Sequence, residues 1–169
     1  MNTHSFKKLA SFLFLAVLLF SFRPVQTVPT DFSGAWKLNE SKSELGQFGA
    51  RSVASKIMIE QKTDVVSLAK TATNFQGEEA ITTEILSFDG KEAETLVFGT
   101  AKRKAKLKWS SDEQNMLVSA TIAFERQGQT FDISITETWS LSADRKTLTV
   151  ASNMTTPQGE ISTKAVYDK

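Results

Sequence analysis

The chain has 169 residues, with 20 lysines and arginines against 19 aspartates and glutamates, a formal net charge of +1. It contains no cysteine and a single histidine, His4, so disulfides, thiolate chemistry and zinc sites built from Cys and His are excluded from the rest of the chain. The near-neutral charge gives no reason to expect nucleic acid as a partner. We also expect no metal and no cofactor.

Residues 1–27 have the composition of a secretory signal peptide, in which two lysines precede the apolar stretch 9–22. Cleavage is expected near Thr27. The apolar stretch has fourteen residues, fewer than the about 20 that a membrane-spanning helix needs, so an uncleaved membrane anchor is the less favoured alternative. We therefore expect an exported protein, periplasmic or extracellular, with a single domain at 28–169. That domain carries 17 basic and 19 acidic residues.

The hydrophobic pattern after residue 27 has a period of two, which is typical of β-strands. In 130–141, apolar residues alternate with threonines and serines. In 101–109, apolar residues alternate with four lysines. Ten strand-length segments are expected, at roughly 34–39, 53–62, 64–74, 79–88, 92–98, 101–109, 116–124, 130–141, 146–154 and 159–167.

Short connections between these segments carry turn-forming pairs such as Asp89-Gly90, and short turns make consecutive strands antiparallel. The predicted fold is all-β, an antiparallel up-and-down β-barrel of about eight to ten strands. At most one short helix is expected, in the connection 40–52 after the first strand. Closure is favoured because it removes the exposed edges of a long sheet. The segments 79–88 and 92–98 could merge, and a hollow and a filled barrel would show the same alternation.

The segment FSGAWKLN, residues 32–39, resembles the opening Gly-x-Trp strand of the calycin superfamily, in particular that of bacterial secreted lipocalin-like domains. The closing STKAVYDK segment, with its basic and aromatic residues, strengthens this resemblance. The resemblance implies a lipocalin-like barrel closed at one end by Gly34 and Trp36, with Lys164 as the basic neighbour of Trp36.

A weaker similarity connects the chain to intracellular fatty-acid-binding proteins. That family closes with an Arg-x-Tyr pair that holds the ligand carboxylate, whereas this chain has Lys164 and Tyr167, a different cation at a different spacing. The connection 40–52 is also too short for the two-helix lid of that family. The resemblance therefore implies the barrel but not a fatty-acid ligand.

Three charged residues interrupt the apolar faces of the predicted strands: Glu137, Arg103 and Lys70. A buried charge is costly unless it is paired or used. These residues could anchor the polar head of an amphipathic ligand. Alternatively, they could form an internal ion pair, or a bulge could turn one of them outward.

Aromatic residues lie on the same apolar faces as these charges. They pack the core of a filled barrel, or they line the cavity of a hollow one. The candidate ligand-binding residues are Glu137, Arg103, Lys70, Trp109, Trp139 and Phe131.

A row of lysines occupies the polar face of 101–109, at Lys102, Lys104, Lys106 and Lys108. We interpret it as a solvated face opposed by Glu92 and Glu94, because cross-strand opposite charges are stabilising. Contact with an anionic membrane surface is the less favoured alternative.

These features favour a monomeric, exported, lipocalin-like protein that binds a small apolar or amphipathic molecule inside the barrel. The alternative is a filled barrel that acts as a protein-interaction or structural module of the cell envelope, without a ligand. We expect no enzymatic activity, because a serine nucleophile after residue 27 would have no histidine base. Glu137 and Tyr167 form the one acid and base pair that could be considered.

Overall fold

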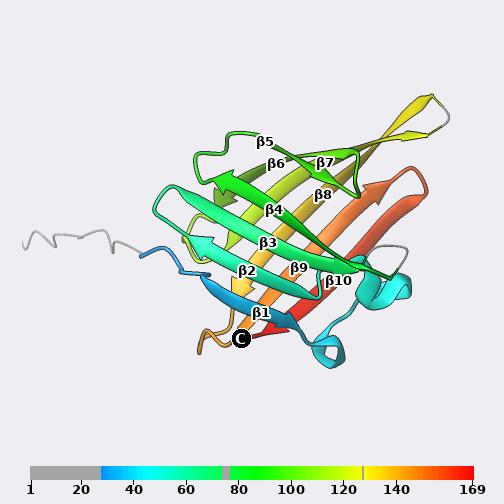
Figure 1. Cartoon of the computed structure of the whole chain (residues 1–169). Helices are drawn as coiled ribbons and strands as arrows, with labels where there is room; N and C mark the ends of the chain where they lie inside the picture. The colour runs from blue at the N-terminus through cyan, green and yellow to red at the C-terminus, as the bar shows by residue number, and fades with distance from the viewer. Residues whose placement is uncertain (1–27, 74–76, 127) are drawn as a thin grey trace, which may run out of the picture.

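The computed structural model describes residues 28–73, 77–126 and 128–169, so the predicted signal peptide lies outside the described residues. The described chain forms ten β-strands and two 3-10 helices (Figure 1). These are β1 (Gly34–Leu38), η1 (Glu40–Lys42), η2 (Gly46–Ser52), β2 (Lys56–Gln61), β3 (Val65–Thr73), β4 (Glu79–Ser87), β5 (Ala93–Val97), β6 (Ala101–Trp109), β7 (Met116–Arg126), β8 (Gln129–Leu141), β9 (Thr147–Thr156) and β10 (Gly159–Asp168). None of the described helices is long and apolar enough to cross a membrane.

The strands form one antiparallel sheet in the order β4-β3-β2-β1-β10-β9-β8-β7-β6-β5, which curls into a nearly closed barrel (Figure 1). Consecutive strands pair throughout, except between β4 and β5, and β1 pairs with β10. The predicted up-and-down barrel is therefore confirmed, with ten strands. The segments expected at 79–88 and 92–98 are separate strands that form the two edges of the sheet.

The two ends of the barrel differ. The turns β2–β3, β4–β5, β6–β7 and β8–β9 gather at one end, here named the closed end, and the turns β5–β6, β7–β8 and β9–β10 gather at the other, here named the mouth (Figure 1). Fully buried side chains fill the closed end. The largest of them are Trp36, Trp139, Tyr167, Phe32, Ile59, Leu68, Leu86, Leu107, Met116, Leu148 and Val66.

The expected helical segment between the first two strands consists of η1 and η2. The Asn39 side chain caps η1 by accepting a hydrogen bond from the backbone N–H of Lys42 at 3.2 Å. Between the two helices, Glu44 forms a short antiparallel bridge with Lys164 of β10, and Leu45 is buried against the core. The segment therefore continues the sheet beside β10 after the short strand β1 has ended.

The lysine row of β6 faces outward, as predicted. Its lysines pair with glutamates in β5 and directly before it. Lys102 lies 3.2 Å from Glu94, and Lys104 and Lys106 each lie 3.6 Å from Glu92. All five side chains are about half exposed, so each pair contributes little, about 0–1 kcal/mol. The row is a solvated face with its own counter-charges.

Candidate functional site

A network of four charged side chains occupies the interior of the barrel. Lys70 of β3, Glu84 of β4, Arg103 of β6 and Glu137 of β8 all lie on the inward faces of their strands. Lys70 Nζ lies 3.4 Å from Glu84 Oε2, and Arg103 Nε donates to Glu84 Oε1 at 3.0 Å. Arg103 Nη2 then reaches Glu137 Oε1 at 3.5 Å. The four residues thus form a continuous chain of alternating charges.

The Glu84–Arg103 pair joins strands on either side of the discontinuity in the sheet. Between the described parts of β4 and β5 there is no backbone ladder, and β5 has only five residues. Glu84 and Arg103 are both buried, so this ion pair is screened little by solvent. It links β4 to β6 from the inside, where backbone hydrogen bonds do not close the barrel.

Trp139 completes the network across the lumen. Its Nε1–H donates to Glu137 Oε2 at 2.9 Å, and Lys70 Nζ lies 5.2 Å from the centroid of the Trp139 ring, a cation–π distance. Four strands separate β3 from β8 in the sheet order, so Lys70 and Trp139 approach from opposite sides of the barrel. At this level the barrel is filled.

The four charges differ in their access to solvent. The Glu84 side chain is 3% exposed, and Arg103 and Glu137 are mostly buried. Lys70 is 22% exposed, the largest value of the four. Lys70 is therefore the cation that a molecule entering the barrel can reach most easily.

The surroundings keep Glu137 ionised. Burial alone would raise the pKa of its carboxyl group. The positive charges of Lys70 and Arg103, with hydrogen bonds from Trp139 and Arg103, outweigh burial and hold the pKa below its ordinary value of 4.5. Burial, and to a smaller extent the negative charge of Glu137, raises the pKa of Tyr167 well above its usual range. Tyr167 is therefore not suited to act as a base, and Glu137 is not suited to act as an acid at neutral pH.

Four of the six predicted site residues belong to this network: Glu137, Arg103, Lys70 and Trp139. The sequence reading missed Glu84. On β4 the isoleucines Ile81 and Ile85 face outward, 70% and 62% exposed, so the more apolar face of this strand is the outer one. The signal that could have identified Glu84 was charge balance, because two internal cations with only Glu137 as a partner would leave one of them unpaired.

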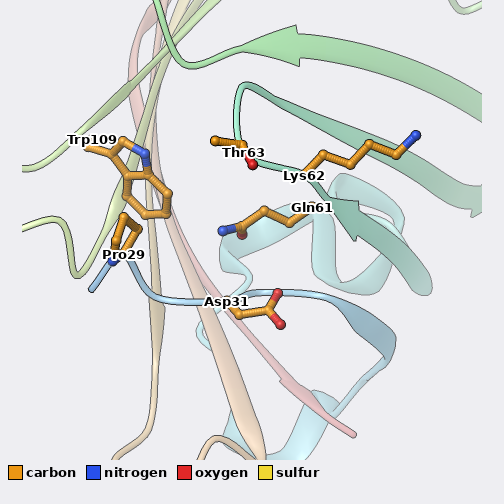
Figure 2. A pocket seen from close by; sticks show the side chains of 6 residues that line it. All are labelled: Pro29, Asp31, Gln61, Lys62, Thr63 and Trp109. Carbon is orange, nitrogen blue, oxygen red and sulfur yellow. The ribbon is translucent and has the colours of Figure 1, made fainter.

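Trp109 lies at the closed end, not among the network residues. Its ring stacks on Phe88 with a centroid distance of 4.6 Å. It also lines an open cleft of about 420 Å³, where Trp109 and Pro29 face Gln61 and Thr63 (Figure 2). The charged residues that line this cleft, Asp31 and Lys62, are exposed. Trp109 belongs to the aromatic packing of the closed end, with Phe32 and Phe88.

Phe131 lies near the mouth, where the β7–β8 hairpin projects beyond the rest of the barrel (Figure 1). It is 38% exposed and pairs with Phe124 across the hairpin. The ring of Phe124 in turn lies 6.0 Å from that of Phe98 in the β5–β6 turn. Phe131 thus belongs to an apolar rim, and no contact joins it to the charged network among the described residues.

Trp36, the residue that the sequence resemblance assigned to barrel closure, packs in the core of the closed end. It is fully buried, and its Nε1–H donates to the carbonyl of Phe32 at 3.0 Å. Lys169 Nζ lies 5.2 Å from the centroid of the Trp36 ring. Gly34 has φ +145°, a backbone conformation that residues with a Cβ rarely adopt, so glycine fits this position.

The prediction that Lys164 is the basic neighbour of Trp36 is wrong. Lys164 faces outward, half exposed, and its Nζ lies 3.7 Å from Glu44 Oε1. Lys164 and Tyr167 are three residues apart on a strand, so they lie on opposite faces, and Tyr167 takes the inward position. Lys169, which follows β10, supplies the cation instead.

On β8, β9 and β10, inward-facing residues become more exposed from the closed end toward the mouth. On β6 they do not, since Ala101 at the mouth is buried and Trp109 at the closed end is half-buried. On β8, Trp139 and Ile135 are buried, Ile133 is half-buried and Phe131 is exposed. The same gradient follows β9 and β10, where Leu148 and Tyr167 are buried. The half-buried inward residues near the mouth are Val97, Phe124, Ile133, Met154 and Ile161. The barrel therefore has a packed closed end, a charged middle layer and an apolar, more exposed mouth.

Comparisons with known proteins place the fold. No family model matches this sequence, and no curated protein matches it. The structure is similar to the crystal structure of zebrafish ileal bile acid-binding protein complexed with cholic acid, with a TM-score of 0.50 and 16% sequence identity, over 82% of this chain and 98% of that chain. The two structures share the fold of an antiparallel up-and-down barrel. The fold expected from the sequence is thus confirmed.

Proposed function

We propose that this protein is an exported binding protein that holds a small apolar or amphipathic molecule in the mouth half of its barrel. The observation that carries this proposal is the gradient of exposure along the inward face of β8, from the buried Trp139 to the exposed Phe131. A protein that needed only a stable core would bury these apolar side chains, because burial stabilises by about 25 cal/mol per Å². The similar zebrafish barrel, described as binding a bile acid, supports the same class of ligand.

The charged network would form the floor of this site. Apolar side chains near the mouth would contact the hydrophobic part of the ligand, and the partly exposed Lys70 lies where a polar group would arrive. Catalysis is not part of the proposal, because the charged residues pair with one another. Within residues 28–73, 77–126 and 128–169, no group of three or more Asp, Glu, His or Cys side chains is placed to hold a metal ion.

Native mass spectrometry tests this function. The full-length gene is expressed in an exporting host, and the purified protein is weighed under native and denaturing conditions. We expect a mass excess that is lost on denaturation, and a denatured mass that corresponds to a chain beginning near residue 28. The first result identifies a carrier, and the second identifies an exported one.

A second candidate function is favoured by one observation: the network from Lys70 to Trp139 fills the lumen at its level. A filled barrel could act as an interaction or structural module of the cell envelope. A native mass without excess, together with unchanged tryptophan fluorescence when bile acids, fatty acids and fatty alcohols are added, would support this module and contradict the carrier. Trp139 is the reporter, because it contacts both Lys70 and Glu137.

A further inference from the structure

The charges inside the barrel cancel. Lys70 and Arg103 carry two positive charges, and Glu84 and Glu137 carry two negative charges. No other charged residue faces inward among the strand residues whose side chains the structure describes. In the described chain, every fully buried side-chain nitrogen and oxygen also has a hydrogen-bond partner. The network therefore offers no excess positive charge to an incoming anion.

Hydroxyl groups surround this neutral network. Thr82 lies directly opposite Lys70 in the strand register, Thr95 lies opposite Arg103, and Ser152 lies opposite Glu137. Thr163 lies opposite Ser152 on β10. Residues directly opposite on antiparallel strands have Cβ atoms about 4.5–5.5 Å apart, so the hydroxyls flank the charges.

These four hydroxyl residues are accessible and uncommitted. Each is half-buried. None of their side chains makes a hydrogen bond to another described residue, in contrast to the charged groups beside them. A hydroxyl group can both donate and accept, so a belt of four can satisfy an alcohol, an ester or an amide.

From this arrangement, and resting on the proposed function, we infer that the barrel selects an uncharged amphipathic molecule, one whose polar end is a hydroxyl, ester or amide group rather than a free carboxylate. The uncharged head hydrogen-bonds to the belt formed by Thr82, Thr95, Ser152 and Thr163. The hydrophobic part lies against the apolar side chains of the mouth.

The physical reason is the cost of an extra charge. A carboxylate that entered a neutral, largely buried network would leave one negative charge in excess, or would have to displace Glu137 from Arg103. An uncompensated buried charge is strongly unfavourable. An uncharged head adds no net charge and meets hydroxyls that are free to pair with it.

A matched pair of probes tests the inference. Dodecan-1-ol and dodecanoic acid have the same chain length and differ at the polar end, and both are used below the concentrations at which they aggregate. Isothermal titration calorimetry at pH 7 on the full-length gene product gives both dissociation constants. We expect the alcohol to bind at least about tenfold more tightly, since tenfold corresponds to about 1.4 kcal/mol.

Two variants shift the net charge of the network in opposite directions. They test whether this charge, rather than hydrophobicity alone, determines the preference between acid and alcohol. Glu137→Gln gives the network a net positive charge, so we expect the ratio of acid to alcohol affinity to rise by at least about tenfold. Lys70→Met gives it a net negative charge, and the ratio should fall. Circular dichroism confirms that each variant is folded, and either one alone is sufficient for the test. A ratio that stays constant in a folded variant overturns the inference.

The hydroxyl belt is tested by Thr95→Val and Thr163→Val, which keep the side-chain shape. We expect each to weaken dodecan-1-ol binding by about three- to tenfold, the effect of one neutral hydrogen bond. Thr136→Val, on the outer face of β8, is the matched control and should leave binding unchanged. Unchanged binding in both belt variants would contradict the assignment of the head group to the belt.

The failures of the two proposals are distinguishable. If the unmodified protein binds dodecanoic acid at least as tightly as the alcohol, the preference for an uncharged ligand is wrong and the carrier function stands. If it binds neither these probes nor a co-purifying molecule, the carrier function itself is wrong, and the inference fails with it.

Discussion

The closed end and the mouth of the barrel are built from different kinds of turn. At the closed end the β4–β5, β6–β7 and β8–β9 turns share a Ser-x-Asp pattern. In each turn the serine hydroxyl donates to the aspartate, for instance from Ser110 to Asp112 at 2.5 Å. The same aspartate accepts the backbone N–H two residues later. At the mouth, the β7–β8 hairpin instead projects beyond the barrel (Figure 1), and its Phe131 is 38% exposed.

This difference means that one end of the barrel contributes mainly to the stability of the fold and the other mainly to ligand access. The closed end combines buried aromatics with turns whose polar groups are satisfied locally, and such regions are the last to open. The mouth leaves apolar side chains accessible, so its residues contribute less to folding and remain available to a ligand. Substitutions at the closed end should therefore affect mainly stability, and those at the mouth mainly binding.

Trp36→Ala should have the largest effect on stability. Trp36 is fully buried and donates a hydrogen bond to Phe32, so we expect a loss of about 3–5 kcal/mol in the free energy of unfolding. Phe131→Ala at the mouth is the matched control, and its loss should be below about 1.5 kcal/mol because the ring is 38% exposed. Urea unfolding followed by circular dichroism measures both. Equal losses at the two positions would remove the distinction between the ends.

Arg103→Met tests the charged layer between the closed end and the mouth. The change leaves Glu84 without its closest cation and Glu137 without its guanidinium partner, so we expect a loss of about 3–5 kcal/mol. The double variant Arg103→Met with Glu84→Gln restores equal numbers of charges and should recover part of this loss. If the double variant is less stable than the single one, packing rather than charge explains the effect. Urea unfolding at pH 7 distinguishes these results.

Glu137 should contribute a pH-dependent part of the stability. Its pKa in the folded protein lies below its ordinary value of 4.5, so its contribution is present above that value and is lost as the pH falls through the folded pKa. We expect Glu137→Gln to be less stable than the unmodified protein at pH 7 by about 1–3 kcal/mol. The difference should narrow as the pH falls below 4.5. Urea unfolding at a series of pH values measures it, and a gap that widens with acid would contradict the assignment.

Much of the barrel could be predicted because its pattern is local. The alternation on β6 assigned the lysines to the outer face and Arg103 to the inner one, and the structure has both. The alternation on β8 placed Glu137 and Trp139 on the same inward face. The outward position of Lys164 was also readable, because three residues separate it from the inward Tyr167.

The remaining features depend on distances that no local pattern contains. Lys70 meets Trp139 across the lumen, from strands on opposite sides of the barrel. Glu84 was hidden by the two exposed isoleucines of its own strand. The position of Trp109 depended on which end of the barrel its strand reached, which is a property of the whole sheet. The face of the sheet on which a residue lies can thus be predicted from the period of two. The residues that it contacts depend on how the sheet closes.

Ser110→Ala should have a smaller effect than the substitutions in the barrel interior and still distinguish the two ends. The Ser110 hydroxyl donates to Asp112 and accepts the backbone N–H of Asn115 at 2.9 Å, so its loss should cost about 1 kcal/mol. Ser162 near the mouth makes one exposed hydrogen bond, to Asn153, and Ser162→Ala should cost less than about 0.5 kcal/mol. Urea unfolding measures the loss of stability in both variants. The comparison requires that the unfolding free energy falls with urea concentration at the same slope in each. A larger cost at Ser162 than at Ser110 would mean that the hairpins near the mouth are no less stable than the Ser-x-Asp turns, and it would contradict the division between a stable closed end and an accessible mouth.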